Sequence, residues 1–172
     1  MLKTLSLAAA VLLLAGSASA QTPKPNDAQI AHIAYTAGAL DVAAGKQALE
    51  ISTNKDVRAF AQEMVRDHVA VNDKALALVT KLGVSPQDNP TSQALSKDAA
   101  TKLAAFGKLK GAEFDKAYLA NEVAFHKTVN GALSSTLIPG AQNAELKSLL
   151  GTGLKLFTEH QAHAEHLAAT VK

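Results

Sequence analysis

The chain contains no cysteine, so it can form no disulfide, no thiolate metal site and no covalently attached c-type haem, and it has no cysteine nucleophile. Tryptophan is also absent, and the aromatic residues are limited to five phenylalanines and two tyrosines. Strand-like alternation of polar and apolar side chains is lacking, whereas alanine and leucine, which favour helices, are abundant. These features predict an all-α protein that is stabilised by packing alone.

A strong excess of one charge is missing as well. The chain has 17 basic and 15 acidic side chains, which alternate in sign along the predicted helices. A nucleic-acid-binding surface would need clustered lysine and arginine. We therefore expect no nucleic acid partner.

Residues 1–20 have the three parts of a secretory signal peptide. Lys3 supplies the basic start, residues 5–15 form an apolar run, and Ala18-Ser19-Ala20 is a cleavage motif. The apolar run is shorter than the roughly 20 residues that a membrane-spanning helix needs. We expect the mature chain, residues 21–172, to be periplasmic or secreted, with no transmembrane segment.

The remaining sequence predicts one domain with four long amphipathic helices. A capping box at Asn26 and Gln29 opens the first helix, and Gly83 ends the second. The long patterns cover about residues 27–52, 56–82, 112–136 and 143–171. A shorter helical pattern over residues 92–106 follows a proline-containing loop. Short outer connections and a long central one predict an antiparallel four-helix bundle with a short extra helix between the second and third long helices.

A weak internal repeat accompanies this pattern. The string His68-Val-Ala-Val-Asn72 matches His126-Lys-Thr-Val-Asn130 at its first, fourth and fifth positions. Two halves with related patterns would place His68 and His126 at similar depths in the bundle.

Two longer strings, residues 57–68 (VRAFAQEMVRDH) and 111–119 (GAEFDKAYL), together with His126 and His163, carry a family resemblance. The chain resembles domain of unknown function 4142, an exported bacterial family grouped with ferritin-like bundles, over nearly all of the mature sequence. The resemblance implies a ferritin-like four-helix fold and an exported location, with outer-membrane association in some descriptions. It implies no established activity or substrate.

Histidines in or beside the apolar stripes are the main indication of chemistry. A buried imidazole costs about 1–3 kcal/mol unless its nitrogens find partners. Glu122 and Glu159 each precede a histidine by four residues and so share its helix face. The predicted metal ligands are Asp41, His68, Glu122, His126, Glu159 and His163, with His160 and His166 flanking them.

The residue types favour particular metals. Imidazoles with one or two carboxylates suit zinc or copper(II), and Met64 beside His68 would admit copper(I). A ferritin-like di-iron site needs Glu-x-x-His on two helices, and the sequence contains no such motif. Iron is therefore less favoured, and a di-iron oxidase is not expected.

Two hypotheses from different classes remain open. The leading one is an exported, non-catalytic four-helix protein that binds a transition metal through inward His and Glu side chains. The alternative is a structural or stress-associated envelope protein in which His68 and His126 only complete a polar core network with nearby Asp, Glu or Tyr side chains. The two differ in whether metal stabilises the fold.

Overall fold

The computed structural model describes residues 24–171, which form six α-helices and one π-helical segment, and no strand. The all-α prediction is therefore confirmed for this part of the chain. The signal-peptide prediction concerns residues 1–20, which lie outside it. The long helices are α1 (Asp27–Ile51), α2 (Lys55–Lys81), α4 (Gly111–Ala132) and α6 (Ala144–Thr170).

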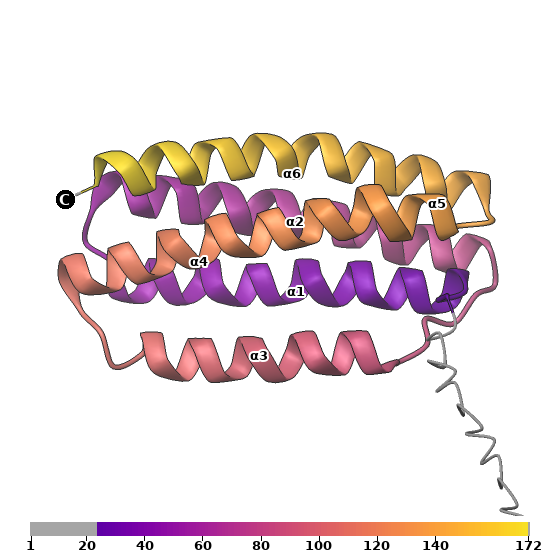
Figure 1. Cartoon of the computed structure of the whole chain (residues 1–172), viewed down its shortest axis with the longest axis horizontal. Helices are drawn as coiled ribbons and strands as arrows, with labels where there is room; N and C mark the ends of the chain where they lie inside the picture. The colour runs from indigo at the N-terminus through magenta and orange to yellow at the C-terminus, as the bar shows by residue number, and fades with distance from the viewer. Residues whose placement is uncertain (1–23, 172) are drawn as a thin grey trace, which may run out of the picture.

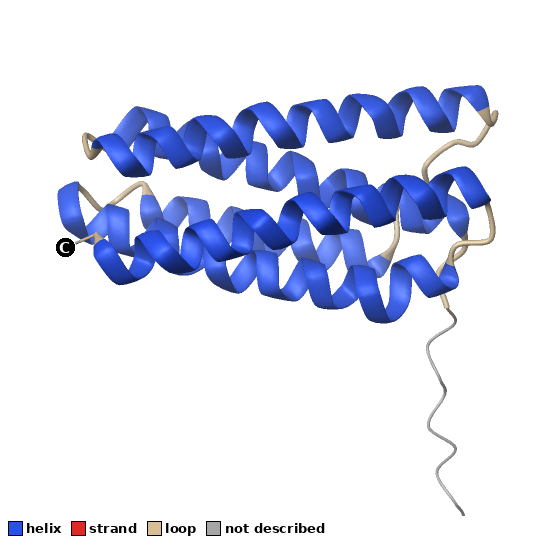
Figure 2. Cartoon of the chain, turned by 90° about the horizontal axis from the view of Figure 1, so that it is seen from above, coloured by secondary structure: helices blue, strands red, loops and turns tan. Residues whose placement is uncertain are grey.

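These four helices lie side by side, and each runs antiparallel to its neighbours (Figure 1). Helices α1 and α2 form one hairpin, and α4 and α6 form the other. Helix α3 (Pro90–Phe106) lies outside them, against α1 and, less extensively, α4, and Figure 2 shows the same arrangement from above. Within residues 24–171, none of these helices combines the length and apolar character needed to cross a bilayer.

Helix ends follow several of the predicted signals. Asn26 and Gln29 form the predicted capping box of α1, and Asn143 caps α6 by accepting backbone N–H groups. Gly83 has a φ of 63°, and its N–H donates to Thr80 while that of Val84 donates to Val79. This is the Schellman arrangement that ends α2.

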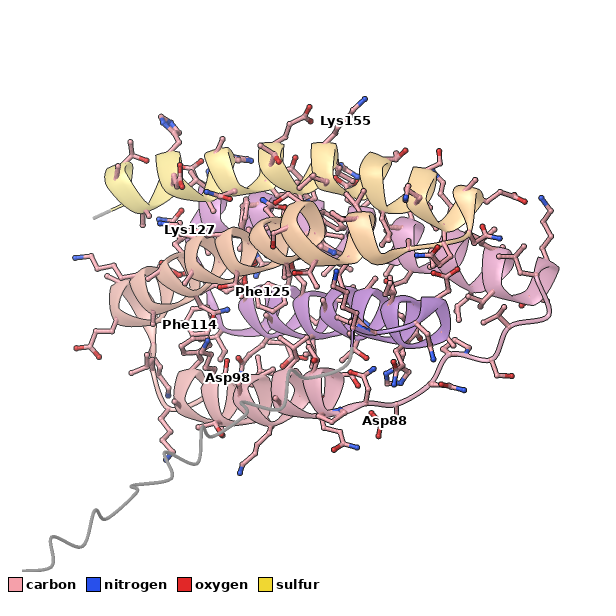
Figure 3. The ribbon with its side chains drawn as sticks, turned by 45° about the vertical axis from the view of Figure 1, so that its right-hand side comes forward. Asp88, Asp98, Phe114, Phe125, Lys127 and Lys155 are labelled. Atoms are coloured by element: carbon pink, nitrogen blue, oxygen red, sulfur yellow. The ribbon has the colours of Figure 1, made fainter. Side chains whose placement is uncertain are left out.

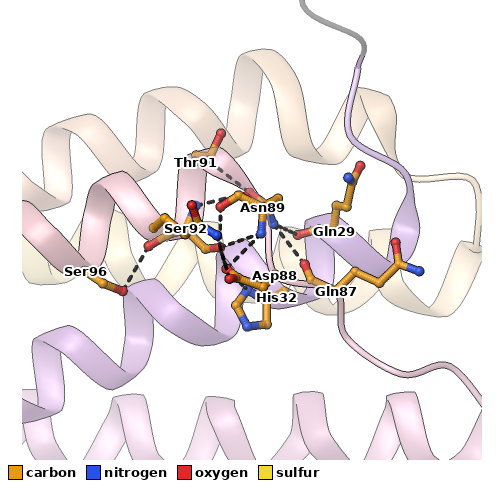
Figure 4. A network of polar contacts seen from close by, with 9 residues as sticks. Gln29, His32, Gln87, Asp88, Asn89, Thr91, Ser92 and Ser96 are labelled. Carbon is orange, nitrogen blue, oxygen red and sulfur yellow. Dashed lines mark hydrogen bonds and ion pairs between the residues drawn. The ribbon is translucent and has the colours of Figure 1, made fainter.

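Helix α3 begins at Pro90, two residues earlier than predicted, because Asn89 caps it (Figure 4). The Asn89 side chain accepts from the backbone of Ser92, and the Ser92 hydroxyl donates to Asp88 over 2.8 Å. The Asn89 amide also donates to the carbonyl of Gln29 over 3.4 Å, which links this end of α3 to α1.

The end of α4 differs from the predicted continuous helix over 112–136. The α-helix stops at Ala132, a π-helical segment covers Leu133–Leu137, and a final turn, α5 (Ile138–Gly140), contains Pro139. Proline lacks a backbone N–H and is tolerated in the first turn of a helix, so helical geometry continues through Pro139 to Gly140, beyond the predicted end near residue 136.

The core has two parts along the bundle. An aromatic part contains Phe60, Phe114 and Tyr118, and an aliphatic part contains Ile30 and Leu146 among others. Figure 3 shows Phe114 on the inner side of α4 and Lys155 directed away from the bundle. On each long helix, the segment between the two parts carries buried polar residues instead. The candidate site lies at this boundary.

Candidate metal centre

Each of the four long helices contributes buried polar side chains at the boundary between the two core parts. Helix α1 contributes Asp41, α2 contributes His68, α4 contributes Glu122 and His126, and α6 contributes His160, all at most 3% exposed. The ring centroids of the three histidines lie 5.4 to 5.6 Å from one another. Three helices therefore present imidazoles to one small volume.

Small residues on α1 allow this helix to approach α2 closely beside Asp41. Gly38 and Gly45 lie three residues before and four residues after it, and both are buried against α2. A Cβ atom on Gly45 would lie 2.9 Å from the Val65 Cγ2 atom and 3.1 Å from the Ala61 carbonyl oxygen. The absence of a side chain at Gly45 therefore lets the two backbones come near enough for Asp41 to contact His68.

Asp41 contacts two of the imidazoles. Its Oδ2 atom lies 2.9 Å from His68 Nε2 and 3.4 Å from His126 Nε2. Neither contact has hydrogen-bond geometry, and both Asp41 oxygens, both His68 ring nitrogens and His126 Nε2 lack a hydrogen-bond partner among the described residues. Leaving such a buried group unpaired costs about 1–3 kcal/mol, so this convergence requires an explanation.

One ring nitrogen of His126 and one of His160 are held by oxygen atoms of neighbouring groups. His126 Nδ1 lies 3.0 Å from the backbone carbonyl oxygen of Glu122, and His160 Nε2 lies 3.1 Å from Asp67 Oδ2. Only an N–H can donate to these acceptors, so His126 Nε2 and His160 Nδ1 carry free lone pairs. A ring that donates one N–H to a carbonyl or carboxylate, with its other nitrogen free, has the usual arrangement of a metal-ligating histidine.

The protonation states of the buried side chains also suit metal binding. Burial opposes ionisation of Asp41, but the facing His68 and His126 more than offset it, so the pKa of Asp41 lies below its usual value. Burial, together with the negative charge of Asp41, raises the pKa of Glu122 well above its usual value. Burial lowers the pKa of His126 to about 4 and also lowers that of His160. At neutral pH these two imidazoles are uncharged beside an anionic Asp41, which is the protonation state that metal binding requires.

Four of the six predicted ligands lie together: Asp41, His68, Glu122 and His126. The other two do not join them. Glu159 is exposed, and His163 pairs with Glu63 on α2, with its Nδ1 atom 2.8 Å from the Glu63 Oε2 atom. The histidine that α6 places in the cluster is His160, which the sequence prediction put beside the ligand set and not in it.

The difference on α6 comes from which of two overlapping stripes faces inward. The sequence predicts an inward stripe with Leu149, Leu156 and both His160 and His163, whereas the structure buries Leu150, Phe157, His160 and Ala164. The second set keeps the large Phe157 ring and the small Ala164 inside and rotates His163 towards the surface. His160 lies on both stripes, so its inward position was predicted even though it was left out of the predicted ligand set.

A family model described as a domain of unknown function, DUF4142, matches residues 13–167. No curated protein and no solved structure matches the chain at a significant level. Because the family model covers most of its length, the protein belongs to the DUF4142 family.

Proposed function

We propose that this protein binds one transition-metal ion inside the helix bundle, through His68, His126 and His160, with Asp41 as the fourth ligand. The observation that carries the proposal is the set of free donor atoms on four helices, two of them on imidazoles whose other nitrogen is already held by a carbonyl or carboxylate oxygen. Glu122 is not a ligand in this proposal; its backbone carbonyl orients the His126 ring.

Distances support a four-ligand site. Ligand atoms about 2.0–2.1 Å from a tetrahedral zinc ion lie roughly 3.3 Å from one another. The contacts of Asp41 Oδ2 with His68 and His126, at 2.9 and 3.4 Å, already have this spacing. Candidate nitrogens of the three histidines lie within 4.8 Å of one another, so binding requires a modest inward movement of the rings.

The donor set selects among metals. Imidazoles with a single carboxylate suit zinc or copper(II) better than iron, which in ferritin-like proteins is bound through several carboxylates. Met64 lies one helical turn before His68 but is packed in the aromatic part of the core. Zinc and copper(II) are thus the first metals to test.

A small pocket offers an ion a route to the site. It lies between α1, α3 and α4, has a volume of about 30 Å³, and is lined by Asp41 and Glu122. Asp98 on α3 and Phe125 on α4 also line it and are labelled in Figure 3. A cavity of about 10–15 Å³ is enough for one water molecule, so a hydrated path to Asp41 is sterically feasible.

The fold and location form part of the proposal. The antiparallel order of the long helices, with α3 in the connection between the two hairpins, supports a ferritin-like four-helix bundle with one extra helix. The signal-peptide pattern of residues 1–20 supports export to the periplasm. We assign the protein a binding role and no catalytic one.

Metal analysis of protein purified without a histidine tag tests the proposal. We expect about one zinc or copper ion per chain after reconstitution, and a rise in the unfolding temperature that His126→Ala abolishes. His166→Ala, which alters an exposed histidine on α6, is the matched control and should retain the ion. Protein that takes up no stoichiometric metal, and is not stabilised by zinc or copper, would contradict the proposal.

The alternative, a polar network that only stabilises the bundle, is favoured by the His160–Asp67 and His163–Glu63 pairs. It predicts that His126→Ala lowers the free energy of unfolding by about 1–3 kcal/mol to the same extent with and without metal. Under the metal proposal, the loss is larger in the presence of zinc. Chemical unfolding with and without a chelator separates the two.

A further inference from the structure

A second cavity lies beside the candidate metal centre, in the aliphatic half of the bundle. Its volume is about 150 Å³, and its walls are almost entirely apolar. His68 and His126 form part of the wall, but most of the lining comes from alanine, leucine, valine and phenylalanine side chains on the four long helices. Representative lining residues are Ala34, Ala37, Ala75, Leu133, Leu150 and Phe157.

Local sequence explains why the core is not filled here. Alanines occupy inward positions where a close-packed bundle of this kind usually has leucine, and Ala34, Ala37 and Ala75 are among them. The π-helical segment contributes both of its end residues, Leu133 and Leu137, to the wall. Single π-helical turns inside α-helices occur frequently at functional sites.

We propose that this cavity binds a compact apolar molecule with the dimensions of a benzene ring. An engineered cavity of similar volume and lining in another protein stays dry and binds benzene or xenon. The chemistry of the wall also suits an aromatic ligand. Phe157 lines the cavity and stacks on His68, with ring centroids 4.5 Å apart and planes 9° apart. Because both rings line the cavity, an aromatic ligand can contact them in edge-to-face geometry.

This inference goes beyond metal binding and does not depend on it. The cavity and the metal-binding atoms share two histidines, but the volume is enclosed mainly by aliphatic side chains that no metal would contact. The test therefore uses metal-stripped protein. Binding of an apolar molecule to this sample does not depend on whether the protein also binds a metal.

The test is a benzene titration of metal-stripped protein followed by amide chemical shifts. We expect saturable changes at residues of the cavity wall, including the π-helical segment, and a higher unfolding temperature with benzene present. Ala75→Leu fills the cavity from α2 and should weaken binding roughly tenfold or more. Ala77→Leu, at an exposed position of the same helix, is the matched control and should bind benzene as the wild type does.

Shifts that do not saturate, or that spread over the surface, would overturn the inference. So would an Ala75→Leu variant that binds as tightly as the wild type. Because the wild-type spectra locate the probe directly, a variant that fails to fold does not remove the test.

Discussion

Asn72 and Asn130 make equivalent contacts in the two hairpins. The Asn72 side-chain amide on α2 donates to the Tyr35 carbonyl on α1 over 3.4 Å, and that of Asn130 on α4 donates to the Phe157 carbonyl on α6 over 3.1 Å. Each asparagine follows a buried histidine of the cluster by four residues. The weak sequence repeat thus corresponds to a repeated contact, and the ring centroids of His68 and His126, which were predicted to lie at similar depths, are 5.6 Å apart.

The two histidines on α6 should differ in their effect on metal affinity. His160 is buried with a free Nδ1, whereas His163 is half-exposed and bonded to Glu63. We expect His160→Ala to lower zinc affinity by about 100-fold or more, because it removes a ligand, and His163→Ala to change it only a few-fold. Competition titration against a chelator measures both. Equal losses in the two variants would show that His160 is not a ligand.

Metal-stripped protein should lose stability as the pH falls from about 6.5 towards 4. Burial lowers the pKa of His126 from 6.5 to about 4, so in this window the unfolded chain binds a proton that the folded chain does not. His160, whose pKa is also lowered by burial, acts in the same direction. The stability contributed by these neutral rings is thus fully present above pH 6.5 and is lost on acidification.

The neighbouring carboxyls modify this dependence in opposite ways. The lowered pKa of Asp41 adds stability that is lost only at still lower pH, below about 3.8. The raised pKa of Glu122 has the reverse sign, because its protonated form favours the folded state and that contribution is lost as the pH rises above 4.5. Urea unfolding at several pH values between 4 and 6.5 gives the free energy of unfolding as a function of pH. This free energy should rise less steeply with pH in His126→Gln than in the wild type, and more steeply in Glu122→Gln. Unchanged slopes in both variants would contradict these assignments.

Gly45→Ala should destabilise the protein by about 1–3 kcal/mol, because the new Cβ would lie too close to α2. Its contacts include the Ala61 carbonyl, which cannot move without the backbone. Gly131→Ala is the control, since a Cβ at that helical position would meet no atom within 4 Å and the variant should gain about 0.5–1 kcal/mol. Thermal unfolding of the two variants measures the expected loss of stability in Gly45→Ala and the expected gain in Gly131→Ala. A stabilised Gly45→Ala variant would show that α1 and α2 are not so closely packed.

Asp27 joins the start of α1 to the start of α6. Its two carboxylate oxygens accept the backbone N–H groups of Gln142 and Asn143, each over 2.8 Å. Asp27→Ala leaves both donors without this partner, so we expect a loss of about 1–3 kcal/mol in the free energy of unfolding. Asp73→Ala, at an exposed position on α2, is the control and should change stability by less than about 0.5 kcal/mol. Similar losses in both variants would exclude a specific role for Asp27.

Local sequence signals predicted the positions of the helices well. Most differences between the prediction and the structure come from contacts between residues far apart in the chain. Asn26 and Gly83 act at the predicted positions because capping depends on neighbouring backbone atoms. The link between Asp27 and the backbone of Gln142 could not be predicted, since it joins residues far apart in the chain. The π-helical segment was also missed, because apolar periodicity does not distinguish one extra residue in a turn from a regular helix.

The residues of the candidate site could be predicted on those helices whose inward face is clear from the sequence. His68 and His126 lie inside because each belongs to a stripe whose inward direction is clear from the sequence, whereas Asp41 lies beside the predicted stripe of α1 and its burial was not fixed by the pattern. On α6 two stripes overlap, and only packing against the other helices decides that His163 faces outward. Glu159 precedes His160 directly and so points to solvent.

Helix α3 has a single buried residue, Ser92, and its other inward side chains are only partly covered. Segments with few buried contacts open locally at a lower free energy than the global unfolding reaction. The amide hydrogens of α3 should therefore exchange with solvent deuterium well before those in the middle of α2 or α4. Each such opening would uncover the pocket at Asp41 and Glu122, which gives an ion a second way to reach these side chains besides the pocket of the closed structure.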